Sequence, residues 1–183
     1  MIHFILNPNA GTNSPQKRAR IINLLQAIPN SKIWQTERVN HASALAKQAI
    51  TEGAHKIIAI GGDGTINEVA SKLVHSDKIL AIIPFGSGNG LARFLNIPLS
   101  SKKAIELINL GKHQIIDTAE LNGRKFFNMA GMGFDAHLSS VFAGNKKRGL
   151  KSYVELGFKE ITTYKAQPYR IEIDGVKYDK DAF

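Results

Sequence analysis

The sequence contains no cysteine, one tryptophan and no long hydrophobic run. Without cysteine the chain can neither form disulfides nor use a thiolate as a nucleophile. A membrane-spanning helix needs about 20 consecutive apolar residues, and no segment approaches that length. The first residues, MIHFILNP, lack the basic start and the extended apolar core of a signal peptide. These absences predict a cytoplasmic protein and leave a peripheral association with a membrane open.

Acidic residues are also scarce, because 15 Asp and Glu stand against 24 Lys and Arg, for a formal net charge of +9. Such an excess attracts phosphate groups, nucleic acid or an anionic membrane surface, or it serves solubility alone. We do not expect a nucleic-acid partner, because the few aromatic residues are not interleaved with the basic ones. The six histidines do not pair with carboxylates at helical metal-ligand spacing, and we interpret them as surface or packing residues.

Apolar runs alternate with amphipathic stretches over the first 112 residues or so. Strands are predicted at residues 2–6, 32–35, 56–60 and 79–83, and helices at residues 16–27, 40–53, 65–74 and 100–110. The last two strands are apolar throughout, which is typical of strands buried on both faces. The alternation predicts an α/β fold, with a Rossmann-like parallel sheet and helices on both of its faces.

The pattern changes after residue 112. Asn122-Gly123 and Asp174-Gly175 each stand between two strand-like runs, which is a strong hairpin signal, and a helix is predicted at residues 150–163. We therefore predict an α/β domain over residues 1–112, followed by the start of a β-rich, sandwich-like second domain over residues 113–183. One hairpin and part of another cannot close a sandwich, so we expect this chain to be a fragment or to be completed from elsewhere.

Three polar loops follow predicted strands: NPNAG at residues 7–11, GGDGT at 61–65 and PFGSGNG at 84–90. The carboxyl ends of parallel strands meet at one edge of a sheet, so these loops should converge on one crevice. Glycine lets backbone N–H groups approach a ligand, and those groups together with a helix N-terminus form an anion site. A glycine-rich turn without a ligand is the alternative for GGDGT. For Arg93, a phosphate contact and a surface salt bridge are equally open.

Asp63 places a carboxylate beside this expected phosphate site. A carboxylate repels phosphate unless it holds Mg²⁺ or accepts a proton from a nucleophile. Thr65 and Glu68 have the spacing of a capping box at the start of the following helix. The loops match neither the P-loop nor the G-x-G-x-x-G fingerprint, because the Gly-Lys-Ser/Thr ending is absent and the glycines of GSGNGLA are spaced differently.

The motifs NPNAG, GGDGTINEV and PFGSGNGLARFLNIP, in this order, resemble the diacylglycerol kinase catalytic domain family, which includes bacterial lipid kinases, sphingosine kinases and ceramide kinases. FFNMAGMGFDA, residues 126–136, is similar to the segment that opens the second domain of that family. The resemblance implies phosphorylation of a lipid hydroxyl with ATP and Mg²⁺, by a nucleotide-binding domain over residues 1–112 and a lipid-substrate domain after it. It extends over most of the chain, whereas GGDGT alone also occurs in NAD kinases and phosphofructokinases.

The resemblance also implies roles for individual residues. Asp63 matches the aspartate proposed as general base in sphingosine kinases, and Asp135 matches a position near the lipid head group. The residues implied at the nucleotide are Asn7, Gly11, Thr36, Gly61, Gly62, Gly64, Thr65, Asn67, Glu68, Gly86, Ser87, Gly88 and Asn89. Lys146, Lys147, Arg148 and Lys151 fall where the family places cations on ATP phosphates, and a solvated basic face explains them equally well.

Two departures from the family pattern leave questions open. Gly90 stands where many members have an aspartate, so a metal-linked aspartate network and the identity of the lipid do not follow from the resemblance. The base proposed for bacterial members would lie beyond Phe183. The expected partners are a lipid substrate and an anionic membrane surface, and a homodimer is an open alternative. The rival interpretations are a kinase of soluble metabolites similar to NAD kinases, against which GSGNGLAR argues, and a non-catalytic nucleotide- or lipid-binding module.

Overall fold

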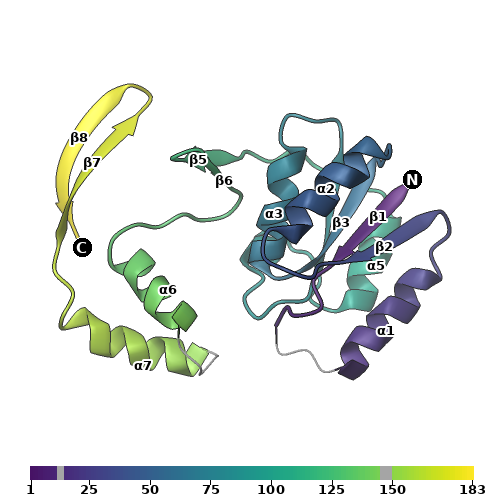
Figure 1. Cartoon of the computed structure of the whole chain (residues 1–183), viewed down its shortest axis with the longest axis horizontal. Coiled ribbons are helices and arrows are strands. Elements are labelled where there is room, and N and C mark those ends of the chain that lie inside the picture. Colours follow the sequence, from purple (N-terminus) through teal and green to yellow (C-terminus); the bar gives the residue numbers. More distant parts are fainter. Residues whose placement is uncertain (12–14, 145–149) are drawn as a thin grey trace. The chain divides into compact units, whose positions relative to one another are not determined.

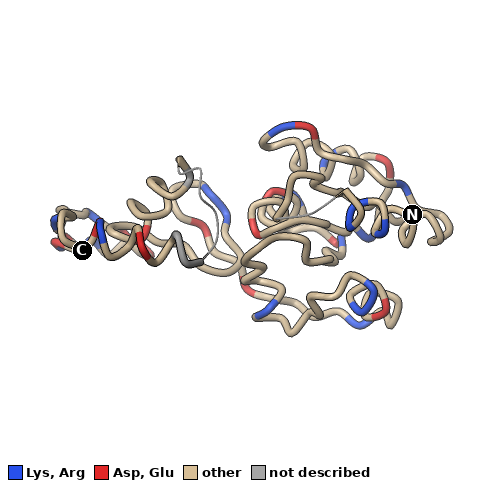
Figure 2. The backbone as a smooth tube through the Cα atoms, turned by 90° about the horizontal axis from the view of Figure 1, so that it is seen from below, with Lys and Arg blue, Asp and Glu red and all other residues tan. Residues whose placement is uncertain are grey.

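The computed structural model describes residues 1–11, 15–144 and 150–183, with the backbone alone at residues 143 and 150–152. It divides into two compact units, Met1–Asn128 and Met129–Phe183 (Figure 1). Lys and Arg are distributed over many elements of both units (Figure 2). In the described part of the chain, no helix has the length and apolar character needed to cross a bilayer.

The first unit is built on a four-stranded parallel sheet in the order β2–β1–β3–β4. Its strands are β1 (Ile2–Leu6), β2 (Ser31–Gln35), β3 (Lys56–Gly61) and β4 (Ile79–Pro84). From Ile57 to Ile60 the side chains of β3 are fully buried, because helices cover both faces of the sheet. The predicted α/β fold with a parallel sheet is confirmed, and the strand bounds agree with the prediction to within one residue.

Alternate residues of β1 point into two hydrophobic cores. Ile5 packs in the core made with α2 (His41–Thr51) and α3 (Asp63–Leu73). Phe4 and Leu6 pack in the other core, with α1 (Pro15–Gln26) and α5 (Ser101–Asn109) (Figure 1). Each large side chain that is fully buried in this way contributes about 1.5–3 kcal/mol through the hydrophobic effect. The short helix α4 (Gly90–Phe94) was not predicted, and it follows directly on the loop after β4.

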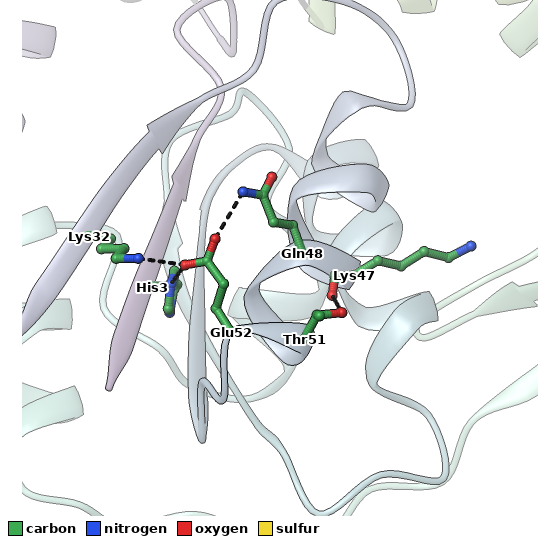
Figure 3. Close-up of polar contacts among 6 residues, drawn as sticks. All are labelled: His3, Lys32, Lys47, Gln48, Thr51 and Glu52. Atoms are coloured by element: carbon green, nitrogen blue, oxygen red, sulfur yellow. Dashed lines mark hydrogen bonds and ion pairs between the residues drawn. The ribbon is translucent and has the colours of Figure 1, made fainter.

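A polar cluster ties the end of α2 to the amino-terminal edge of the sheet (Figure 3). The Glu52 carboxylate accepts hydrogen bonds from Lys32 Nζ at 2.6 Å and from Gln48 Nε2 at 2.9 Å, and it lies 3.3 Å from Nε2 of His3. The His3 ring is fully buried, with its centroid 4.6 Å from that of Trp34. The hydrogen bond from Lys32 is the main reason that the pKa of Glu52 falls from its ordinary 4.5 to about 2.

The first hairpin, β5 (Ala119–Leu121) with β6 (Arg124–Phe126), belongs to the first unit. Its turn residues Asn122 and Gly123 have φ values of 50° and 75°, as a two-residue type I′ turn requires. Strand β6 contacts α3, and Phe127 packs against the core that α2 and α3 share. These contacts explain why the division between units falls after Asn128, whereas the prediction placed it at residue 112.

The described residues of the second unit form two helices and the second hairpin: α6 (Phe134–Gly144), α7 (Leu150–Ile161), β7 (Gln167–Ile173) and β8 (Val176–Ala182). The hairpin turn lies at Asp174 and Gly175, as the sequence predicts. The helix α6 was not predicted. The rings of Phe134, Tyr164 and Phe183 contact one another with centroids 5.2–5.4 Å apart, and they tie the start of α6 to the C-terminal end of the described chain.

Candidate active site

The three polar loops meet at the carboxyl ends of β1, β3 and β4, as the strand order requires. They line a cavity of about 250 Å³ that is open to solvent. The residues that line it are Asn7, Ala10, Gly11, Gly62, Asp63, Gly64, Thr65, Glu68, Gly86, Ser87 and Gly88. All except Ala10 are residues that the family resemblance implies at the site. We call this space the glycine cavity.

The first glycine loop, GGDGT at residues 61–65, and the second glycine loop, PFGSGNG at residues 84–90, are in direct contact through their backbones. A Cβ on Gly86 would overlap the Cα of Gly62, and it would lie 3.1 Å from the backbone nitrogen of Gly62. A side chain is therefore excluded at Gly86, whereas a Cβ on Gly62 would lie 3.3 Å from the Cα of Gly86, a tight contact. The hydrogen bond from Phe85 N to Gly61 O, 2.8 Å long, extends the pairing of β3 and β4 up to the point where the loops begin.

The side chain of Thr65 is held by a hydrogen bond from Asn7 and by close packing against Gly61. Its hydroxyl oxygen accepts a hydrogen bond of 2.9 Å from Nδ2 of Asn7, which joins the NPNAG loop to the GGDGT loop. A Cβ on Gly61 would lie 2.5 Å from the Cβ of Thr65, so Gly61 leaves the space that this buried threonine fills. The predicted capping box is wrong. Helix α3 begins at Asp63 with Gly62 as its N-cap, and Thr65 lies inside the helix.

Glu68 caps a neighbouring helix instead of its own. Its two carboxylate oxygens accept hydrogen bonds from the backbone N–H groups of Asn40, at 3.2 Å, and Ala42, at 3.0 Å. Asn40 is the N-cap residue of α2, and its own side chain makes no capping hydrogen bond. The Ser43 hydroxyl donates to the carbonyl of Glu68 at 2.9 Å. Glu68 thus provides the capping that α2 would otherwise lack, and it connects α3 to the segment before α2.

Asp63 is the exposed carboxylate at the rim of the glycine cavity. It is the first residue of α3, where the helix dipole favours a negative charge. Its Oδ1 accepts a hydrogen bond of 3.4 Å from the backbone N–H of Leu91, and its Oδ2 lies 3.0 Å from the place of a Cβ on Gly88. The carboxylate therefore stands directly against the second glycine loop, which is bare at that point.

Asn89 and Arg93 brace the second glycine loop from within. Asn89 is buried in a left-handed conformation, and its amide makes two hydrogen bonds with the backbone of Gly86, at 2.9 Å to N and 2.8 Å to O. The Arg93 Nε donates to the carbonyl of Gly88 at 3.0 Å, so this arginine holds the loop. Bracing of the backbone is a role for Arg93 that neither of its two sequence-based interpretations included.

A second cavity, of about 360 Å³, shares Asn7, Thr65 and Glu68 with the glycine cavity. Its other lining residues are Asn9, Thr36, Glu37, Arg38, Val39 and Ala42. Thr36 is buried at the end of β2, where its backbone N–H donates to the carbonyl of Leu6 at 2.9 Å. We call this space the side cavity. The hydrogen bonds of Glu68 to Asn40 and Ala42 fix the segment that forms its outer wall.

Not all of the predicted site residues line the two cavities. Asn67 lies on α3 but lines neither cavity, and its carbonyl accepts a hydrogen bond from Ser71. Asp135 lies in the first turn of α6, in the second unit. Lys146, Lys147 and Arg148, and the side chain of Lys151, lie outside the described residues. Among residues 1–11, 15–144 and 150–183, no group of three or more acidic or histidine side chains is arranged to hold a metal ion.

Together these features define an α/β domain that presents two bare glycine loops and the exposed Asp63 carboxylate at the carboxyl edge of its parallel sheet. The amino-acid sequence assigns the chain to a particular family. The model of the diacylglycerol kinase catalytic domain matches residues 1–121, and the chain belongs to that family.

The chain is also similar to individual proteins and solved structures. A diacylglycerol kinase of Staphylococcus aureus strain RF122 is 30% identical over 185 residues, covering 98% of this chain and 59% of the relative. An uncharacterized protein of Synechocystis is 32% identical and covers 94% of this chain and 43% of the relative. A crystal structure of a diacylglycerol kinase from Bacillus anthracis has a TM-score of 0.72, with 27% identity over 99% of this chain and 61% of that one. The chain thus spans about 59% of the length of the staphylococcal kinase.

Proposed function

We propose that the protein is an ATP-dependent lipid kinase, which transfers the γ-phosphoryl group of ATP to a hydroxyl group of a diacylglycerol or a sphingoid-like lipid. The observation that carries this proposal is the exposed Asp63 carboxylate beside a cavity walled by backbone glycines. Glycine walls suit an anionic ligand that must approach backbone N–H groups. A carboxylate in that position suits a ligand that brings its own cation or a proton to be removed.

The two adjoining cavities suggest how ATP is accommodated. The phosphates fit the glycine cavity, where the N-terminus of α3 and the backbone of both glycine loops favour negative charge. The nucleoside fits the side cavity, with Thr36 and Asn7 as polar partners at its inner end. Ser87 lines the glycine cavity with a hydroxyl group that can donate to a phosphate oxygen.

Mg²⁺ would be held at Asp63 together with phosphate oxygens. This carboxylate is exposed at the cavity, whereas both oxygens of Glu68 already bind backbone N–H groups. A hard cation of this kind prefers one or two carboxylates plus phosphate oxygens and water. When bound, it would neutralise charge that develops on the phosphates.

Asp63 is proposed as the general base. The proton of the lipid hydroxyl passes to the Asp63 carboxylate, and the hydroxyl oxygen uses its electron pair to form the new P–O bond. The bond between the γ-phosphorus and the bridging oxygen breaks, and ADP leaves with that electron pair. The backbone N–H groups of the glycine loops hold the phosphates still while this exchange occurs.

The lipid is proposed to come from a membrane that the protein touches from the cytoplasm. The net charge of +9 favours an anionic membrane surface, and Asp135 is the proposed contact to the lipid head group. Lys146, Lys147, Arg148 and Lys151 are proposed to neutralise ATP phosphates. The chain spans 59% of the length of the staphylococcal relative, and the activity is proposed for the whole protein; the proposal does not require turnover by residues 1–183 alone.

A substrate comparison tests the function. The protein is incubated with [γ-³²P]ATP and Mg²⁺ and with one of three acceptors: dioctanoylglycerol micelles, sphingosine micelles, or a mixture of soluble metabolites that contains NAD. We expect label in a lipid product. Label in a soluble product would instead favour the kinase of soluble metabolites, and ATP binding without any transfer would favour a binding module.

A further inference from the structure

Gly90 and Asn128 occupy one small space beside Asp63. A Cβ on Gly90 would lie 2.6 Å from Nδ2 of Asn128 and 3.7 Å from Oδ1 of Asp63. The first distance is shorter than real Cβ contacts allow, so a side chain on residue 90 and the present position of the Asn128 amide exclude each other. The backbone of Gly90 is not left-handed, so the conformation of the chain does not by itself require glycine there.

The chain that leads to Asn128 is anchored in the first unit. Phe127 packs against the core formed with α2 and α3, and β6 contacts α3, the helix that begins with Asp63. The Asn128 side chain itself is exposed, so its amide can reach a ligand. A carboxamide offers both a hydrogen-bond donor and an acceptor, and it brings no second charge next to the carboxylate.

The two oxygens of Asp63 face different surroundings. Oδ2 lies against Gly88, which lines the glycine cavity. Oδ1 lies near Gly90, which does not line that cavity, and near the backbone N–H of Leu91. Asn128 therefore adjoins the carboxylate on the side of Oδ1, while the space that suits phosphates lies on the side of Oδ2. A group that approaches Oδ1 of Asp63 along Gly90 would meet the Asn128 amide.

We propose that Asn128 is a further residue of the acceptor site, and that Gly90 is the residue that lets it stand there. This inference rests on the proposed function. The Asn128 amide hydrogen-bonds the acceptor lipid at or next to the hydroxyl group whose proton passes to Asp63, and so it orients the attacking oxygen. Because Gly90 has no side chain, the neutral amide of Asn128 can lie beside the catalytic carboxylate. Any side chain at position 90 would displace that amide.

The test is a double-mutant cycle with Gly90→Ala, Asn128→Ala and the combination of both, in the full chain. Acceptor kinetics are measured with dioctanoylglycerol micelles at saturating ATP. ATP binding is measured by calorimetry, and the ¹⁵N side-chain amide resonance of Asn128 is assigned through its loss in Asn128→Ala. Each single change should lower kcat/KM for the acceptor about tenfold, as expected for one lost or misplaced hydrogen bond. ATP affinity should stay within about twofold, because neither residue lines the glycine cavity.

The double variant distinguishes a direct effect of Gly90 on Asn128 from a general loss of activity. Once Asn128 is an alanine, a Cβ at position 90 meets no amide, so the double variant should be no slower than Asn128→Ala alone. Fully additive losses, or wild-type kinetics for Asn128→Ala, would overturn the inference. Gly144→Ala is the matched control, because a Cβ there meets no atom of the described residues within 4 Å. It should leave both the kinetics and the Asn128 resonance unchanged.

The amide resonance of Asn128 tests the inference even if the proposed function is wrong. If the wild-type chain binds ATP but phosphorylates no acceptor, the kinase proposal is wrong for this chain, and the spectrum still tests the pair. The inference then expects the Asn128 amide resonance to shift in Gly90→Ala and on addition of dioctanoylglycerol. An Asn128 resonance that moves in neither case would overturn the inference.

Discussion

The backbones of Gly62 and Gly86 touch, at a point where a Cβ on Gly86 would overlap the Cα of Gly62. The two residues follow β3 and β4, which are neighbours in the sheet, and the strands stay paired up to Gly61 and Pro84. The loops thus cross immediately after the strands end. This crossing of two main chains forms the part of the cavity wall that Gly62 and Gly86 line.

Gly86→Ala should therefore damage the cavity and the fold together. The new methyl group must push the two loops apart, and it would also lie 3.0 Å from Oδ1 of Asn89, whose amide closes the second loop. We expect a loss of about 1–3 kcal/mol in the free energy of unfolding, the usual cost of overpacking, together with weaker ATP binding. Urea unfolding and calorimetry measure the two effects. The same substitution at Gly144 should be neutral or slightly stabilising, and an equal loss at both positions would contradict the argument.

The sheet and its loops could be predicted because their determinants are local. Strands such as residues 57–60 are apolar throughout, and a parallel sheet then requires the loops after them to share an edge. The two hairpins could be predicted because Asn-Gly and Asp-Gly adopt the left-handed turn conformations that other pairs avoid. The register and the turn positions follow from these few residues.

The side-chain partnerships could not be predicted, because they join segments that are distant in sequence. Thr65 and Glu68 have the local spacing of a capping box, yet Thr65 receives the amide of Asn7 and Glu68 caps α2. The proximity of Gly90 to Asn128 likewise depends on how β6 packs against α3. Helix α6 was missed because its sequence, FDAHLSSVFAG, lacks a clear amphipathic period and a start signal.

Glu68→Gln should loosen the segment before α2. A glutamine keeps one oxygen acceptor but turns an NH₂ group toward the second backbone N–H, so the start of α2 loses a charge-assisted hydrogen bond. We expect the free energy of unfolding to fall by about 1 kcal/mol, as for the loss of an N-cap. ATP should bind more weakly because the wall of the side cavity is less fixed. Thermal unfolding and calorimetry check this, with Glu106→Gln on the exposed face of α5 as the control. Equal effects of the two changes would contradict a capping role.

Glu52→Gln should lower stability in a manner that depends on pH. The folded-state pKa of Glu52 is about 2, against an ordinary value of 4.5. Above pH 4.5 the carboxylate is ionised in both states, and its contacts stabilise the fold in full. Between pH 4.5 and 2 the unfolded chain takes up the proton first, so this contribution is progressively lost. The stability gap between wild type and Glu52→Gln should therefore be largest at neutral pH and close toward pH 2, as followed by urea unfolding at several pH values.

Lys32→Met separates the main cause of that low pKa from the minor ones. The hydrogen bond from Lys32 is the largest contribution, ahead of those from Gln48 and His3. Without it the pKa of Glu52 should rise toward 4.5. In the Lys32→Met background, the stability difference made by Glu52→Gln should then be lost over a narrower range of pH. A gap that stays constant from pH 7 to pH 2 in the wild-type background would mean that Glu52 does not titrate as described.

Asp63→Asn should separate binding from transfer. The amide has nearly the same shape as the carboxylate, and its oxygen can still accept the N–H of Leu91, so the second glycine loop should keep its conformation. It cannot accept a proton from the acceptor hydroxyl, so phosphoryl transfer to dioctanoylglycerol should fall by a factor of about 10²–10⁴, the usual contribution of a general base. ATP affinity measured without Mg²⁺ should be unchanged or higher, because a negative charge beside the phosphates has been removed. Transfer at the wild-type rate by this variant would show that another group removes the proton, and it would equally contradict a role of the Asp63 carboxylate in holding the cation.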